Sequence, residues 1–321
     1  MMSSRPKFGE LPHVGETQER HAWEVFGPAD QLGSVNLLTP EKVKHAARLI
    51  RTGQVFNLSL PLNFPITLYA GFRSKGYRHH IETGRGGRDD YVDNFAMQGS
   101  SQWDSLRHIR FREHGYYGGR QDGDLDEKGE LGIEHWAQHG IVGRGVLLDG
   151  ARYMETQQTP LDMTKKFEMD GAFLEQVARE QKVQLEPGDI LILRTGWLEW
   201  YKSLDERGRE ALRDTLGVGE APHACPGLAA SQETAAWLWD RQIAAIAADN
   251  VAVEALPVDP AVGFQHRRLI ALQGMPLGEL LDVEELARAC AQDGLYECML
   301  VAIPLNLPGG VGSPANAYAI K

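Results

Sequence analysis

The sequence has little cysteine and no long apolar segment, and each of these absences excludes a class of protein. Its three cysteines among 321 residues, Cys225, Cys290 and Cys298, are too few for a disulfide framework and have no metal-binding spacing. We therefore expect packing residues in a reducing compartment. No run approaches the ~18 apolar residues of a membrane-spanning helix. The first residues, MMSSRPKFGELPH, include no apolar core of a secretory signal, so a cytoplasmic protein is expected.

Basic residues are also fewer than acidic residues. The chain has 33 lysines and arginines against 44 aspartates and glutamates, a net charge of −11. Binding to nucleic acid or to an anionic membrane through overall charge is therefore not expected. Two explanations of the excess acid remain open: it keeps the protein soluble, or some carboxylates bind a cation.

Several motifs of common enzymes are missing. The sequence contains no G-x-S-x-G, which removes support for a serine hydrolase of the α/β type. It also contains no G-x-G-x-x-G after a strand and no phosphate-binding Gly-Lys-Ser/Thr loop. Nucleotide binding through these loops is therefore not expected.

Apolar periodicity and turn residues predict strands that alternate with a few helices. The predicted helices begin after Thr39, at Ser231 and at Asp282, and the predicted strands cover residues 56–62, 145–148, 190–193, 243–248 and 296–303, followed by an irregular tail at 307–316. This pattern is typical of a mixed α/β fold with a mostly β core flanked by helices. No repeat or linker divides the chain, so we expect an N-terminal extension at 1–22 and a single domain at 23–321.

The segment at residues 97–111 carries polar side chains that suit a metal site. Gln98, Gln102, Asp104 and His108 follow one another at intervals of four, two and four residues. On a straight strand the outer two would lie ~33 Å apart, and on a straight helix they would point in different directions. The chain must therefore bend if they converge, and the small residues at 99–101 make a bend credible.

These residue types point to a divalent cation. Asp104 is an oxygen ligand, His108 is a ligand or a general acid/base, and a glutamine carbonyl is a weak neutral ligand. Further along the chain, His266 and Glu279 would complete a mixed nitrogen and oxygen site. The alternative is a polar loop with structural side chains, together with a solvent-facing histidine and a glutamate at the start of a helix.

Taken in order, these segments resemble the cyclase family of metal-dependent hydrolases, which includes kynurenine formamidase and isatin hydrolase. The similarity runs from about Trp23 to the C-terminus. It rests on four segments: FGPADQLGSVNLLTPE, Ser100–His108, the pair His266 and Glu279, and LPGGVGSPANAYAI. Gln98 and Gln102 stand where the family motif His-x-x-x-His-x-Asp-x-x-x-His has its first two histidines. That departure resembles the branch containing trans-dienelactone hydrolase, a zinc-dependent enzyme.

The resemblance implies one Zn²⁺ or Mn²⁺ ion held by Asp104, His266 and Glu279, with Gln102 as a further candidate ligand. His108 would be the catalytic base, and Gln98 and Gln102 would orient water or the substrate carbonyl. The implied reaction is hydrolysis of a small cyclic ester or amide (a lactone, lactam or imide) by a homodimer or homotetramer. An arylformamidase acting on N-formylkynurenine and a metal-free binding protein remain as alternatives.

Candidates for substrate binding are less well defined. Trp103 and Phe72 are aromatic residues that either wall a planar pocket or belong to the core. Arg73 and His80 lie in a basic, glycine-rich segment, where an arginine would bind a substrate carboxylate through two hydrogen bonds.

Overall fold

The computed structural model describes residues 5–65, 68, 73, 76–213, 215–216 and 223–321. Its centre is a nine-stranded sheet in the order β1-β13-β11-β5-β7-β9-β10-β4-β12. These strands are β1 (Val55–Asn57), β4 (Gln102–Asp104), β5 (Ile141–Asp149), β7 (Ile190–Arg194), β9 (Ala245–Ala248), β10 (Leu277–Glu279), β11 (Glu297–Ala302), β12 (Gly312–Pro314) and β13 (Ala317–Ile320). The strands β5, β7, β9 and β10 pair in parallel, and the strands outside them pair antiparallel.

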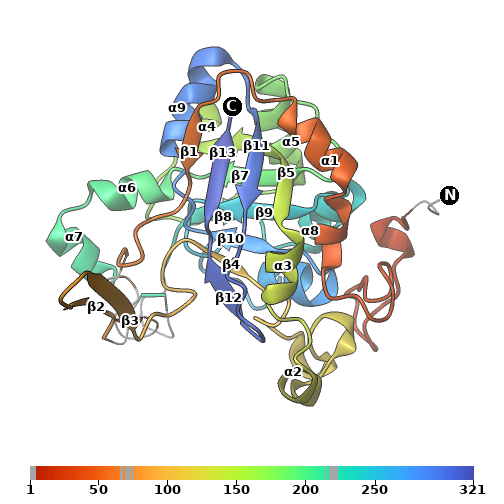
Figure 1. The fold of residues 1–321 in the computed structure, drawn as a ribbon. Coiled ribbons are helices and arrows are strands. Elements are labelled where there is room, and N and C mark those ends of the chain that lie inside the picture. Colours follow the sequence, from red (N-terminus) through yellow and green to blue (C-terminus); the bar gives the residue numbers. More distant parts are fainter. Residues whose placement is uncertain (1–4, 66–67, 69–72, 74–75, 214, 217–222) are drawn as a thin grey trace.

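Helices flank the curled sheet, and several gather around one end of it (Figure 1). They are α1 (Pro40–Ala47), α2 (Asp122–Lys128), α3 (Glu134–His139), α4 (Gly150–Thr156), α5 (Gly171–Glu180), α6 (Trp197–Ser203), α7 (Glu206–Ala211), α8 (Gln232–Asp240) and α9 (Glu284–Asp293). Short turns of other helix types are η1 (Phe8–Glu10), η2 (Gly33–Leu37), η3 (Arg112–His114), η4 (Tyr117–Gly119) and the π-helical η5 (Arg267–Leu272). The predicted mixed α/β architecture is confirmed.

Several local predictions hold because the capping chemistry is local. The Thr39 side chain accepts a hydrogen bond from the Lys42 backbone at the start of α1. Ser231 does the same for α8 by accepting from the backbone of Thr234. The strands β5, β7 and β9 are almost wholly buried, as continuous apolar runs predict for the parallel centre of a sheet.

Three local predictions differ from the structure. The strand predicted at 56–62 covers only Val55–Asn57. Helix α9 has Val283 at its N-cap with no side-chain cap, and Asp282 instead forms an ion pair with Lys202. The tail was expected to be irregular, but residues 312–314 form β12. Pairing with β4 decides this, because Gly312 lies opposite Asp104, and such long-range pairing overrides local composition.

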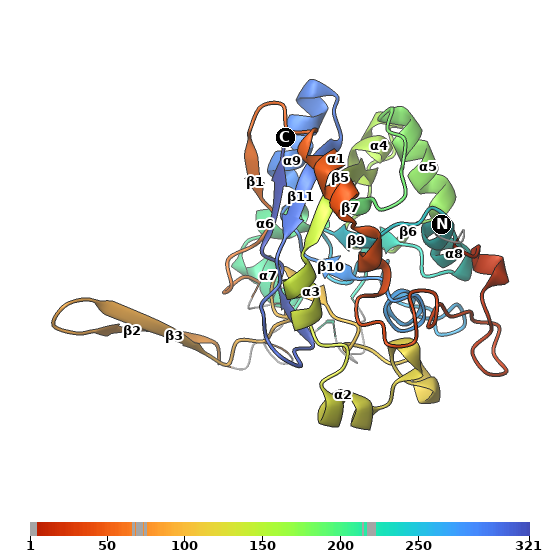
Figure 2. The ribbon, with the colours of Figure 1, turned by 45° about the vertical axis from the view of Figure 1, so that its right-hand side comes forward.

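The core continues from the sheet into the flanking helices, and all three cysteines are buried and unpaired in disulfides, as predicted. Among the described residues, no helix is long and apolar enough to cross a membrane. Two small sheets complete the fold: β6 (Phe167–Met169) pairs with β8 (Pro226–Leu228), and β2 (Arg78–Thr83) forms a hairpin with β3 (Arg88–Asp93). Figure 2 shows this hairpin projecting away from the rest of the molecule.

Candidate metal centre

The predicted bend in the first polar segment is present. Before β4, a turn closes with the Gly99 backbone donating to the Ala96 carbonyl at 2.9 Å. After β4, a turn closes with the His108 backbone donating to the Ser105 carbonyl. The chain is therefore turned on both sides of a three-residue strand.

Strand pairing aligns this segment with a distant one. Antiparallel pairing of β4 with β10 places Gln102 opposite Glu279 and Asp104 opposite Leu277. Because side chains alternate along a strand, Gln102 and Asp104 share one face and Trp103 takes the other. The sheet thus brings two carboxylates together from residues far apart in the sequence.

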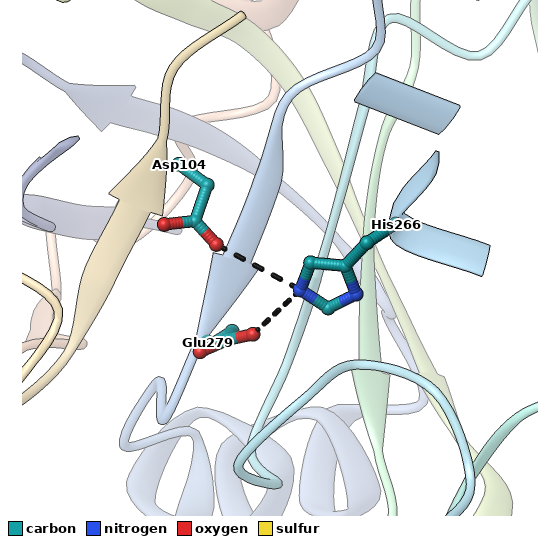
Figure 3. A group of neighbouring side chains, drawn as sticks. All are labelled: Asp104, His266 and Glu279. Atoms are coloured by element: carbon teal, nitrogen blue, oxygen red, sulfur yellow. Dashed lines mark hydrogen bonds and ion pairs between the residues drawn. The ribbon is translucent and has the colours of Figure 1, made fainter. Parts of the chain in front are cut away.

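Asp104, His266 and Glu279 form a compact group (Figure 3). One ligand atom from each lies within 4.8 Å of the others, and all three residues are buried. His266 Nε2 is 3.0 Å from Glu279 Oε1 and 3.8 Å from Asp104 Oδ2. This is the mixed carboxylate and imidazole donor set predicted for a divalent ion.

The Asp104 carboxylate shows that a cation fits here. It is 0% exposed, and within the described chain neither of its oxygens has a hydrogen-bond partner. The nearest imidazole nitrogens, on His266 and His108, are at 3.8 and 3.7 Å, beyond hydrogen-bond distance. A buried carboxylate without a hydrogen-bond partner is costly, and a cation bound among these residues would remove that cost.

His266 is oriented by a residue that the sequence did not reveal. Its Nδ1 lies 2.5 Å from Glu254 Oε1, and Glu254 Oε2 accepts from the Gln265 backbone at 2.5 Å. Glu254 is fully buried. Donation of the Nδ1 proton to Glu254 leaves Nε2 facing Asp104 and Glu279, which is the orientation that a metal ligand requires. No periodicity or motif singles out Glu254, because it lies in an irregular segment.

Neighbouring charged groups shift the pKa values of His266 and Glu279. Burial lowers the pKa of His266, but Glu254 and Glu279 outweigh burial and hold that pKa well above its usual range. Burial and the neighbouring Asp104 raise the pKa of Glu279. Both shifts favour protonation of His266 and Glu279 when no ion is bound. A divalent cation would replace the positive charge of these protons and displace them from the cluster.

Two further side chains hold the second oxygen of Glu279. Gln102 Nε2 donates to Glu279 Oε2 at 2.5 Å, and Arg73 Nη1 lies 3.9 Å from the same oxygen. Arg73 also donates to the Gln98 backbone carbonyl at 2.8 Å. Oε1 is thereby left to face His266. Gln102 Oε1 is buried without a partner in the described chain, so the amide has one acceptor to offer.

His108 is the accessible member of the site. Its Nδ1 is 3.7 Å from Asp104 Oδ1, and its ring centroid is 6.3 Å from that of His266. Its side chain is 20% exposed, whereas that of Asp104 is 0% exposed. A histidine at the solvent side of a buried acidic group is well placed to exchange protons.

Of the remaining predicted residues, Gln98 lies next to the strand that pairs with Asp104, and the others lie elsewhere. Gln98 has its amide against Gly312, where an added Cβ would come within 2.4 Å of Nε2, and that nitrogen has no partner in the described residues. Trp103 is 0% exposed and donates to the Ala315 carbonyl from the core. His80 lies in the projecting hairpin. Phe72 lies outside the described residues.

The comparisons with known proteins agree with this fold. A family model named Cyclase matches residues 56–255. A crystal structure described as that of a novel cyclase is 34% identical and covers 94% of this chain and 99% of that chain, with a TM-score of 0.78. The chain therefore belongs to the Cyclase family, as its sequence segments indicated. No curated protein matches the chain.

More distant structures share the fold. Isatin hydrolase A from Labrenzia aggregata, bound to benzyl benzoate, is 16% identical and covers 89% of this chain and 98% of that chain, with a TM-score of 0.58. A structure described as a predicted metal-dependent hydrolase, from Bacillus stearothermophilus, is 13% identical and covers 84% of this chain and 98% of that chain, with a TM-score of 0.50. Structural neighbours of this chain are thus described as hydrolases.

Proposed function

We propose that the protein is a metal-dependent hydrolase that opens a small cyclic ester or amide, such as a lactone, lactam or imide. The observation that carries the proposal is the buried group of Asp104, His266 and Glu279, in which the Asp104 carboxylate has no hydrogen-bond partner among the described residues. A Zn²⁺ or Mn²⁺ ion held by these three residues would polarise a carbonyl and acidify water.

The protein's own residues would perform the proton transfers. His108 Nδ1, which faces Asp104, would take the proton from the attacking water and return it to the leaving group. Two carboxylates donate more charge to an ion than neutral histidines do. Water bound to such an ion would therefore be less acidic, and removal of its proton would depend more on a base. Gln102 and Arg73 would keep Glu279 in place, as their contacts with Oε2 indicate.

We propose one ion rather than two. The residues that the structure describes contain a single group suited to a metal, and Gln98 and Gln102 are neutral amides. Neutral amides are weak ligands and would not offset the charge of a second divalent cation.

We propose that a cavity separated from His266 by the Phe264 ring is the substrate pocket, although Asp104, His266 and Glu279 do not line it. Phe264 stacks on His266 with ring centroids 4.9 Å apart, and it lines a cavity of about 490 Å³ together with Phe111, Arg112 and Arg267. This size is typical of small-molecule sites. Arg267 Nε is buried without a partner in the described chain. We propose that the two arginines bind a carboxylate of the substrate, which the net charge of the protein would otherwise repel.

A metal-supplemented substrate screen tests the proposal. Purified protein would be analysed for bound metals and assayed with Zn²⁺ or Mn²⁺ on a lactone, a dienelactone, a cyclic imide, isatin and N-formylkynurenine. The two glutamines motivate the dienelactone, and the name of the isatin hydrolase neighbours motivates isatin. We expect ring opening that Asp104→Asn abolishes. Formamide hydrolysis alone would favour the arylformamidase, and protein that binds no metal would favour a non-catalytic binding protein.

A further inference from the structure

Two residues with left-handed backbones lie directly beside the two glutamates that contact His266. Val253 has a φ of +58° and precedes Glu254, and Leu280 has a φ of +54° and follows Glu279. A positive φ is strained in most residues other than glycine, and in a β-branched residue such as valine it is a genuine outlier. The surrounding structure must therefore hold both residues in this conformation.

The strain at Val253 belongs to a tight turn. The Glu254 backbone N–H donates to the Ala252 carbonyl at 2.5 Å, which closes a γ-turn with Val253 at its centre. The form of this turn with a positive central φ is rare and strained. Val253 is also held in the core, where it is 1% exposed. Because the turn fixes the backbone of Glu254, it decides where the carboxylate of that residue points.

The side chain of Asn250 closes over this turn. Its Nδ2 donates to the carbonyls of Val253 and Glu254 at 3.3 and 3.2 Å, and to the carbonyl of Pro226 at 2.9 Å. Asn250 is 0% exposed, so these bonds form away from solvent. The fit is close, since a Cβ added at Gly227 would lie 2.5 Å from Nδ2. One amide thus ties the strained turn to the neighbouring strand β8.

The backbone of Asn250 holds the other strained residue. Its carbonyl accepts from the Leu280 N–H at 3.0 Å. The Leu280 carbonyl in turn accepts from Ser101 Oγ at 2.5 Å. Asn250 therefore contacts both the segment that carries Glu254 and the segment that carries Glu279.

We propose that Asn250 is a positioning residue for the metal centre. Its amide keeps Val253 in the left-handed conformation, and the Glu254 carboxylate is thereby held against His266 Nδ1. Asn250 has no part in the ligand set, so it acts through Glu254. The role rests on the metal site proposed above, because it is exercised on the imidazole of that site.

Metal binding by the Asn250→Ala protein tests this role without turnover. Removal of the amide frees Val253 to return to a negative φ and turns the Glu254 carboxylate away from His266. We expect the affinity for Zn²⁺ and for Mn²⁺, measured by competition with a chromophoric chelator, to fall about 10–100-fold, as for other residues that orient a ligand. Asn250→Ser leaves a smaller cavity, should lower both affinities as well, and serves if Asn250→Ala does not fold.

The added substitution Val253→Gly separates positioning from a general effect on stability. Glycine takes a positive φ without strain, so Val253→Gly in the Asn250→Ala background should restore the affinity to within about threefold of wild type. The same substitution removes a buried side chain, so a role in stability alone would make the double variant worse. Ala252→Gly in the same background is the control and should restore nothing, since Ala252 is not among the residues with a positive φ.

The outcomes distinguish this role from the proposed function. Wild-type protein that binds neither Zn²⁺ nor Mn²⁺ would overturn the metal site, and the role of Asn250 with it. Wild type that binds metal while Asn250→Ala or Asn250→Ser binds it equally well would overturn the positioning role alone. Failure of Val253→Gly to restore the affinity would do the same.

Discussion

Glu254 Oε1 lies 2.5 Å from His266 Nδ1, and this contact lies inside the protein, where Glu254 is 0% exposed and His266 4% exposed. The same carboxylate is fixed through its other oxygen by the Gln265 backbone. A carboxylate that is itself held at both oxygens restricts the imidazole to one tautomer and one orientation. The Nε2 atom of His266 is therefore aimed at the carboxylates of Asp104 and Glu279 before any ion binds.

Removing the charge of Glu254 should weaken metal binding. We expect Glu254→Gln to lower Zn²⁺ or Mn²⁺ affinity by about 10–100-fold, because the amide no longer accepts the Nδ1 proton as strongly. Competition with a chromophoric chelator measures this without turnover. Asp259→Asn, a change to an exposed acid on the same segment, is the control and should bind like wild type. Equal affinities of Glu254→Gln and wild type would refute the orienting role.

Asp104 should couple metal binding to stability. In chelator-treated protein we expect Asp104→Asn to be more stable than wild type, by about 1–3 kcal/mol, since it removes a buried carboxylate that has no hydrogen-bond partner among the described residues. With metal added, wild type should gain stability and the variant should not. Thermal melts of wild type and of Asp104→Asn, each with chelator and with metal, give the four stabilities to be compared. A variant that still gains stability from metal would contradict ligation by Asp104.

His108 should be needed for turnover and dispensable for the ion. We expect His108→Ala to retain its metal and to lose about 10²–10⁴-fold in kcat, the usual contribution of a general acid/base. Elemental analysis and a lactone assay on the same sample separate the two effects. Loss of the metal in this variant would make His108 a ligand and the assigned role wrong.

Arg267 should act on affinity for charged substrates. We expect Arg267→Gln to raise KM for a lactone that carries a carboxylate, with little change for its neutral methyl ester, because only the former needs the guanidinium. The ratio of kcat/KM for the two substrates is the measured quantity. An equal loss of kcat/KM for the two substrates would show that Arg267 stabilises the fold and does not bind the substrate carboxylate.

His223 should make stability depend on pH. Burial lowers its pKa to about 4, and its Nε2 has no partner among the described residues. The unfolded chain then binds the proton more readily, so stability is full above the unfolded pKa and is lost as pH falls toward the folded one. The expected loss is roughly 2 kcal/mol between about pH 7.5 and about pH 5.

Several other groups, among them Asp189 and Asp249, give a pH dependence of stability with the opposite sign, and their contributions must be cancelled. Burial raises the pKa of Asp189 and of Asp249 to about 6, so their folded forms bind protons more readily in the same range. The difference between wild type and His223→Asn in urea unfolding removes these contributions, since both proteins share them. That difference should shrink by the stated amount on acidification, and a constant difference would argue against a buried neutral His223.

The local structure was largely predictable because its causes are local. Thr39 and Ser231 cap helices whose first turns lie directly after them, and the apolar runs at β5 and β7 need no distant information to be read as strands. The β12 strand was not predictable in this way. Its glycine and proline content indicates a loop, and only pairing with β4 makes it a strand.

The candidate site was likewise predictable from the sequence only in part. The residue types of Asp104, His108, His266 and Glu279 were compatible with a cation site, since carboxylate and imidazole chemistry is carried by the residues themselves, and the resemblance of four segments indicated the Cyclase family. The alignment of β4 with β10, the contact of Glu254 with His266 and the burial of Trp103 were decided by the tertiary structure alone. Each depends on which distant segments become neighbours, and strand pairing and core packing set those neighbours.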